Sequence, residues 1–97
     1  MIFGDYEWDD AKAESNLAKH GVAFETATRA FRDAFGLGFL DDRGSDDEER
    51  WIRLGMVEGT VLFVVYVERG PRKRIISARE AEKMETDFYF QQNTSGE

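Results

Sequence analysis

The sequence predicts an α+β domain in which an antiparallel sheet packs against two N-terminal helices and one C-terminal helix. The first observation is the apolar run over residues 61–67, which has four β-branched residues and no helical period. Such a run is typical of a strand that is buried on both faces. The second observation is the helical spacing of apolar residues near both ends of the chain. The third is the shortness of the turns between strands, because strands joined by short turns pair antiparallel.

The composition is that of one globular domain. A chain of 97 residues is long enough for a single core, so residues 1–97 are expected to form one domain. The absence of cysteine excludes a disulfide scaffold and zinc–thiolate sites and suits a reducing cytoplasm. No apolar run is long enough to span a membrane, and the first residues lack the charged start of a signal peptide. The sequence therefore predicts a soluble cytoplasmic protein that has no membrane partner.

The N-terminal third of the chain predicts a short strand followed by two helices. Residues 2–8 alternate loosely and indicate the strand. Asp9 is a good N-cap for a helix over residues 10–19, and Gly21 supplies the left-handed turn that ends it. A second helix is expected over residues 24–33, where apolar residues recur at helical spacing.

The middle of the chain predicts four consecutive strands. They are expected over residues 35–39, 50–56, 60–67 and 72–76, with a charged, mobile loop over residues 41–49. Gly36 and Gly38 in the first of these strands predict a close approach of backbone on one face.

The last helix is expected from residue 78 to about residue 90. Ser77 and Glu80 have the spacing of a capping box, in which both side chains bind free amides at a helix start. Arg79 in the first turn and Arg74 on the preceding strand are then expected to converge on one anion beside that helix start. Residues 91–97 are expected to be a disordered tail.

The charge of the chain is distributed unevenly. The net charge of −7, taken as one number, argues against a nucleic-acid binder. Residues 69–79, here called the basic segment, nevertheless contain no acid and five cations: Arg69, Arg72, Lys73, Arg74 and Arg79. Guanidinium groups clustered in this way favour a phosphate or a carboxylate. The alternative is that they form a solvated edge strand, which protects the sheet from aggregation.

Several short motifs in this order resemble the BrnT family, the ribonuclease toxins of bacterial type II toxin–antitoxin modules. The matching residues are Tyr6-Glu7-Trp8-Asp9, Lys12, Asn16, Lys19-His20-Gly21-Val22, Phe24-Glu25, Glu49-Arg50, Gly55, Val64-Val65-Tyr66, Glu68-Arg69-Gly70, Arg74-Ile75-Ile76-Ser77-Ala78-Arg79 and Ala81. The resemblance implies a RelE-like fold and an endoribonuclease that cleaves RNA without a metal ion or other cofactor. It also implies a cognate antitoxin with a DNA-binding part, so that the toxin reaches operator DNA only through the antitoxin. Departures from the family pattern are Val67 in place of threonine, Ala34 in place of proline, and the acidic net charge.

Metal-free RNA cleavage defines the candidate site residues. It needs a base for the 2′-hydroxyl proton, cations for the phosphorane-like state and an acid for the leaving oxygen. Arg74 and Arg79 are the candidates for holding the phosphate, because arginine matches phosphate oxygens in a two-pronged way. His20, the only histidine, is a candidate for proton transfer, and Lys19 beside it for phosphate support. Both residues equally fit a structural role at a helix C-terminus.

Three further residues are candidates for substrate binding: Arg50, Arg69 and Ser77. A second function remains open, in which the chain is a degenerate toxin that binds its antitoxin without cleaving RNA. In either case the basic segment is expected to meet an acidic segment of the antitoxin.

Overall fold

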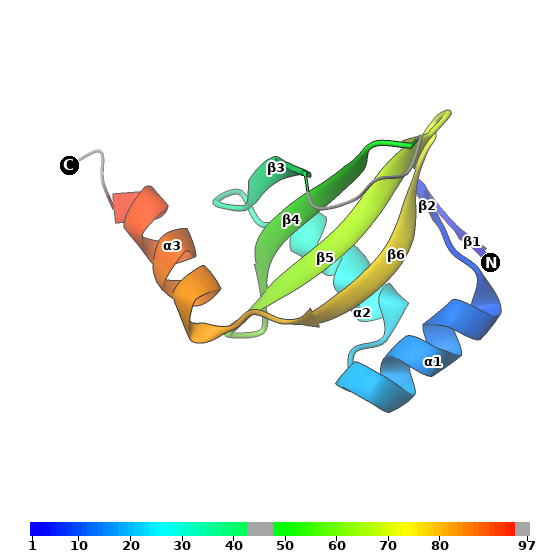
Figure 1. The fold of residues 1–97 in the computed structure, drawn as a ribbon, viewed down its shortest axis with the longest axis horizontal. Coiled ribbons are helices and arrows are strands. Elements are labelled where there is room, and N and C mark those ends of the chain that lie inside the picture. Colours follow the sequence, from blue (N-terminus) through cyan, green and yellow to red (C-terminus); the bar gives the residue numbers. More distant parts are fainter. Residues whose placement is uncertain (43–47, 95–97) are drawn as a thin grey trace.

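The computed structural model describes residues 1–42 and 48–94, which form one sheet and three α-helices (Figure 1). In chain order the elements are β1 (Ile2–Phe3), β2 (Tyr6–Glu7), α1 (Asp10–His20), α2 (Phe24–Thr28), the short 3-10 helix η1 (Arg29–Arg32), β3 (Leu37–Asp41), β4 (Arg50–Val57), β5 (Thr60–Arg69), β6 (Arg72–Glu80) and α3 (Lys83–Thr94). The α+β class is confirmed. Within the expected loop over residues 41–49, residues 43–47 lie outside the described part of the chain.

The sheet is mixed and has the order β1-β2-β6-β5-β4-β3. From β3 to β6 each strand pairs antiparallel with the next one in the chain, which confirms the expected sequential order. The purely antiparallel sheet is wrong, because β2 pairs parallel with β6. The helices and three strands separate β2 from β6 in the chain, and only such a long connection can join parallel strands.

Each face of the sheet carries its own apolar cluster. The face that α1, α2 and η1 cover, here called the helix face, buries Trp8, Val22, Phe24, Ala27, Ala30, Val57, Leu62, Val64, Tyr66, Ile75 and Ala78. The opposite face, here called the α3 face, buries Ile52, Leu54, Val61, Phe63, Val65 and Tyr89. This arrangement explains why β5 is a continuous apolar run, since both of its faces are covered.

Local signals set the limits of α1 correctly. The side chain of Asp9 accepts hydrogen bonds from the backbone N–H groups of Ala11 and Lys12, at 2.8 and 3.1 Å. Gly21 ends the helix with a φ of 72°. Between these ends, the buried Asn16 side chain hydrogen-bonds both the N–H and the C=O of Ala78 in β6. These bonds fix α1 against the helix face of β6.

The expected start of the last helix is wrong. Ser77 and Glu80 belong to β6, where they pair with β5, and α3 begins only at Lys83. β5 is ten residues long and offers backbone partners beyond Ile76, so ladder pairing overrides the local capping signal. The expected tail is wrong over residues 91–94, which are helical, while residues 95–97 lie outside the described part.

Two glycines allow close approaches beside β4. A Cβ on Gly55 would lie 2.2 Å from the carbonyl oxygen of Ala30 in η1, so this glycine lets η1 lie directly on the strand. A Cβ on Gly36 would lie 2.3 Å from the guanidinium of Arg53. Gly38, which was expected to allow a similar approach, has its nearest neighbouring atom at 4.0 Å. The crowded glycines are therefore Gly36 and Gly55.

Candidate functional site

Arg74 and Arg79 lie on the same face of the sheet because β6 contains a bulge. Arg74 pairs with Val67 of β5, and Arg79 pairs with Phe63, four residues earlier in that strand. Side chains directly opposite each other share a face, so both arginines lie on the α3 face. The register of the ladder shifts once between the two pairs. Without this extra residue, a spacing of five would put the arginines on opposite faces.

Arg74 forms an ion pair with Glu7 at the open end of this row. Its Nη1 lies 2.8 Å from Oε2 of Glu7, and the side chains are only 28% and 18% exposed. The parallel pairing of β2 with β6 places Glu7 directly beside Arg74 in the sheet. Within the described residues, Glu7 is the only hydrogen-bond acceptor that the Arg74 guanidinium contacts. A proton acceptor thus lies beside a cation that has further N–H groups available.

Arg79 is held more firmly. Its Nη1 and Nη2 donate to the two carboxylate oxygens of Glu85 in α3, at 2.8 and 2.9 Å. Its guanidinium carbon lies 3.9 Å from the centre of the Phe63 ring. Glu85 also accepts from the N–H of Glu82 at 2.8 Å and so completes one half of a capping box. Arg79 therefore joins β6 to the true start of α3.

Most cations of the basic segment are paired with acids from elsewhere in the fold. Arg69 pairs with Glu48 at 3.0 Å, and Lys73 pairs with Glu68 at 3.2 Å on the exposed hairpin end. Arg72 makes a long bond of 3.4 Å to the carbonyl oxygen of Gly4. The positive charge of the basic segment is thus largely neutralised by acids that the fold brings next to it.

The other substrate-binding candidates lie at different places. Ser77 is half-buried on the α3 face of β6, between Arg74 and Arg79, so it shares their surface. Arg50 begins β4, where its backbone pairs with Asp41 in β3. Arg69 is exposed at the hairpin end. Only Ser77 thus joins the row formed by the two arginines.

His20 and Lys19 lie on the other side of the sheet. Both are exposed in the last turn of α1, which is fixed against the helix face by Asn16. Arg74 and Arg79 point to the α3 face, so the strand itself separates them from the end of α1. In the part of the chain that the structure describes, no contact joins His20 or Lys19 to either arginine. The structure does not bring the two halves of the expected site together.

A comparison with known families identifies the family of the chain. A family model described as "Ribonuclease toxin, BrnT, of type II toxin-antitoxin system" matches residues 8–85. The chain belongs to the BrnT family. The match includes Arg74, Ser77 and Arg79 and begins one residue after Glu7. A search of curated proteins found no match.

In this BrnT family member, sequence reasoning missed the acids of the site. Glu7 lies in the motif that carries the resemblance, but nothing local shows that β2 will lie beside β6. Glu85 is recognisable only once the helix start is moved to residue 83, because it then stands at the third helical position. Glu7 is 67 residues from Arg74, whereas Glu85 is only six residues from Arg79 but was hidden by the wrong helix start.

A second polar cluster on the α3 face was also missed. The Asp33 carboxylate accepts from the Tyr89 hydroxyl at 2.5 Å and from the Met56 N–H at 2.7 Å. Burial raises the pKa of Tyr89 to about 12, together with its hydrogen bond to Asp33. Burial would also raise the pKa of Asp33, but the bonds from Met56, Tyr89 and Phe35 outweigh it and lower that pKa. The cluster ties α3 to β4 and is structural in character.

The described residues set limits on other chemistry. Among them, no group of three or more histidine, cysteine or acidic side chains is placed to hold a metal ion. No helix in the same part of the chain is long and apolar enough to cross a membrane.

Proposed function

We propose that this protein is a toxin of a bacterial type II toxin–antitoxin system and an endoribonuclease that cleaves RNA without a metal ion. The observation that carries the proposal is the ion pair of Glu7 and Arg74 on the α3 face of β6. Family membership supports ribonuclease activity in general. We further assign the cleavage of RNA to Glu7 and Arg74.

Glu7 acts as the base of the reaction. Its carboxylate takes the proton of the ribose 2′-hydroxyl, and the oxygen attacks the adjacent phosphorus while the bond to the 5′-oxygen breaks. The products are a 2′,3′-cyclic phosphate and a 5′-hydroxyl group, whose proton comes from solvent water. Arg74 is 2.8 Å from Glu7, so the phosphate oxygens that gain charge lie within reach of its guanidinium.

Arg79 and Ser77 extend the site along β6. The Cα atoms of Arg74 and Arg79 are about 13 Å apart, as judged from the rise of the strand opposite them. We assign Arg79 to a neighbouring phosphate of the RNA and not to the scissile one. This replaces the convergence of both arginines on one anion, since the helix start that required it is absent at Ser77. His20 and Lys19 stay candidates only for contacts with RNA on the far side of the strand.

The partners follow from the family. A cognate protein antitoxin neutralises the toxin in the cytoplasm, and its DNA-binding domain carries the complex to operator DNA. The order of β3 to β6, with α1 and α2 on one face and α3 on the other, supports a RelE-like fold.

The test is single-turnover RNA cleavage by the purified protein in EDTA. Glu7→Gln and Arg74→Ala should each slow cleavage by about a hundredfold or more, the scale of losing a general base or one charge-stabilising group. The matched control is Glu68→Gln, which breaks the neighbouring pair with Lys73 and should cleave at the wild-type rate. Wild-type cleavage that is abolished by EDTA would refute metal independence. Unchanged rates in both site variants would refute the assignment.

The non-catalytic alternative rests on one observation. The cations of the basic segment are largely paired with acids, and an arginine that is already paired binds RNA less strongly than a free one. If the wild-type protein binds its antitoxin and leaves RNA intact, the chain is a degenerate toxin. If it cleaves, this alternative is excluded.

A further inference from the structure

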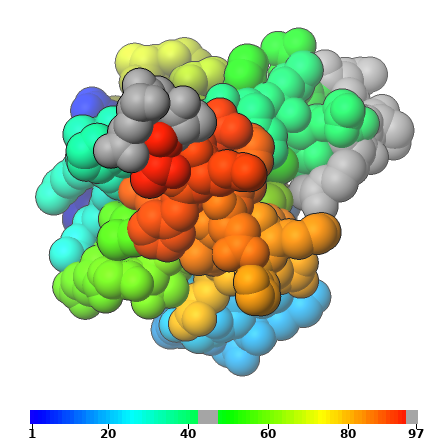
Figure 2. Space-filling view, turned by 90° about the vertical axis from the view of Figure 1, so that its left-hand side faces the viewer, coloured from blue at the N-terminus to red at the C-terminus, as the bar shows by residue number. Residues whose placement is uncertain are grey.

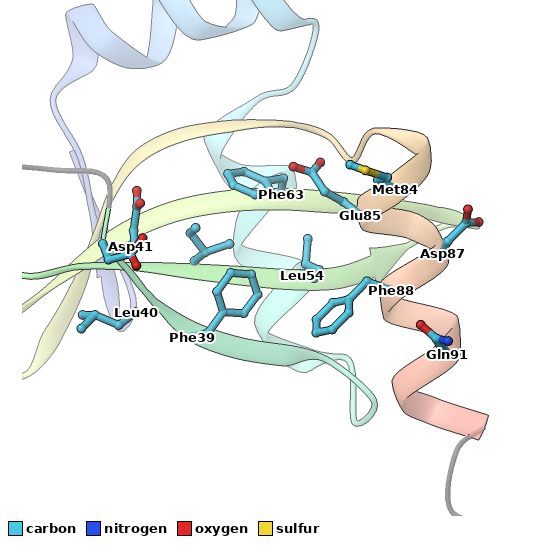
Figure 3. A pocket seen from close by; sticks show the side chains of 12 residues that line it. Phe39, Leu40, Asp41, Leu54, Phe63, Met84, Glu85, Asp87, Phe88 and Gln91 are labelled. Atoms are coloured by element: carbon cyan, nitrogen blue, oxygen red, sulfur yellow. The ribbon is translucent and has the colours of Figure 1, made fainter.

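An apolar groove of about 760 Å³ lies on the α3 face between β3 and α3. Its lining comes from four elements, as Figure 3 shows, and neither Glu7 nor Arg74 contributes to it. The apolar lining residues are Phe39, Leu40, Ile52, Leu54, Phe63, Met84 and Phe88. Phe39 and Phe88 meet edge to face across the groove, with their ring centres 6.4 Å apart. In the space-filling view of Figure 2, α3 and β3 lie side by side on this surface.

Much of this apolar lining is open to water. The exposed fractions are 37% for Phe39, 45% for Leu40, 42% for Phe88 and 79% for Met84. Scattered apolar residues on a surface are ordinary, but a contiguous exposed patch in a hollow marks an interaction site. The groove is therefore a candidate surface for a partner that supplies apolar side chains.

The rim of the groove determines the charge of that partner. Four of the twelve lining residues are acidic, namely Asp41, Asp42, Glu85 and Asp87, and none of the twelve is a lysine or an arginine. Glu85 already pairs with Arg79, so the negative charge of the rim comes mainly from the aspartates. An RNA phosphate would be repelled here, whereas lysine and arginine side chains would be attracted. Among the described residues, Asp87 pairs with Lys83 at the exposed surface, and such a pair is readily exchanged for a partner's cation.

We propose that this groove receives an amphipathic helix of the antitoxin, with apolar residues on one face and lysine or arginine residues beside them. The inference rests on the proposed function, which supplies the antitoxin, and it changes the expected contact. A helix in an apolar groove is held by anchors spaced three or four residues apart. The acidic segment expected from the sequence would instead meet a basic segment in which four of the five cations are already paired with acids. The groove thus lies apart from Glu7 and Arg74 but reaches Arg79, whose partners Glu85 and Phe63 line it.

The first test places a charge in the groove. Met84→Glu adds a carboxylate at an exposed position in the first turn of α3, where an acid is compatible with the helix. We expect this substitution to raise the Kd at least tenfold for the purified cognate antitoxin, which is encoded in the same operon as the toxin. The matched control is Leu17→Glu on α1, a 49% exposed apolar residue outside the groove, which should change the Kd less than twofold. Equal affinities of the two variants would overturn the inference.

The second test concerns the rim. Neutralising Asp42 and Asp87 together as Asp42→Asn and Asp87→Asn should slow association severalfold at low salt and much less at high salt. The matched control neutralises Glu14 and Glu25 as Glu14→Gln and Glu25→Gln, two exposed acids on the helix side of the sheet, and should leave the rate unchanged. An unchanged rate in the rim variant, or an equal slowing in the control, would overturn the inference.

These outcomes are separable from those of the proposed function. RNA cleavage is measured on the free toxin, so its loss in Glu7→Gln does not depend on the groove. If the wild-type protein does not bind the antitoxin, the partner assignment and the groove fail together. If the wild-type protein binds and Met84→Glu binds equally well, only the groove fails.

Discussion

The contact between Arg79 and Glu85 allows a stability change to be worked out from the geometry. The ion pair is bidentate and its side chains are 27% and 24% exposed, so it contributes up to about 1 kcal/mol. The guanidinium over the Phe63 ring adds about 0.5–1 kcal/mol. Arg79→Ala should therefore lower the free energy of unfolding by about 1.5 kcal/mol. Glu85→Ala removes the same pair and the bond to the N–H of Glu82, and should cost about 2 kcal/mol.

These losses in the free energy of unfolding correspond to large changes in the melting temperature of a domain of this size. A change of 1 kcal/mol shifts Tm by about 4–8 °C in a domain of 60–100 residues. We expect a fall of about 6–12 °C for Arg79→Ala and of about 8–16 °C for Glu85→Ala, measured by circular dichroism. The sequence alone suggests no change for Arg79→Ala, because it places Arg79 in an exposed first turn. Lys83→Ala, which breaks a fully exposed pair on the same helix, is the matched control and should leave Tm nearly unchanged.

A double-mutant cycle measures the interaction between Arg79 and Glu85 directly. If the two residues act as a pair, the double variant should lose about 0.5–1 kcal/mol less than the sum of the single variants. Strict additivity of the two single effects would show that the pair does not form in solution. A Tm unchanged by either substitution would show that β6 and α3 are joined by other contacts.

Three further predictions concern stability. Gly55→Ala puts a Cβ 2.2 Å from the Ala30 carbonyl oxygen, which is backbone and cannot turn aside, so urea unfolding should show a loss of about 1–3 kcal/mol. Because the pKa of Tyr89 is raised to about 12 in the fold, its contribution is complete below pH 10 and is lost as the pH rises from 10 to 12. Tyr89→Phe should remove that loss from the pH dependence of urea unfolding, and an identical alkaline limb in both proteins would contradict it. Ser77→Ala should change the free energy of unfolding by less than about 0.5 kcal/mol, because Ser77 lies in β6 and caps no helix; a larger loss in urea unfolding would show that it does.

The parts of the fold that local chemistry determines could be predicted from the sequence. Asp9 and Gly21 mark the start and the end of α1 as expected, since an N-cap and a left-handed glycine each act within one turn of helix. The order of β4 to β6 followed from short turns between the strands, and the place of β3 beside β4 from their sequence order. The family followed from short motifs, each of them weak, that occur in one order from residue 6 to residue 81, and a family model over residues 8–85 confirms it.

The parts that failed depend on contacts between distant segments. The capping pattern at Ser77 was overridden because β5 is long enough to pair with residues 77–80 of β6. The parallel position of β2, which places Glu7 beside Arg74, leaves no signal in the spacing of side chains. The bulge in β6 also leaves no recognisable pattern in the sequence, although it places two arginines five residues apart on the same face. Local patterns therefore brought out the two arginines that share the α3 face, but not the carboxylates that pair with them.

In the mechanism proposed above, these surroundings let an acidic chain present a site for RNA. A free row of arginines would bind any polyanion, whereas Arg74 and Arg79 are each held by one carboxylate in a defined position. Within the described residues Arg74 donates only to Glu7, so phosphate can approach its remaining N–H groups without removing the carboxylate. The same carboxylate is then already beside the 2′-hydroxyl when the phosphate is bound. On this argument the acids that lower the general affinity for RNA are what make the bound RNA react.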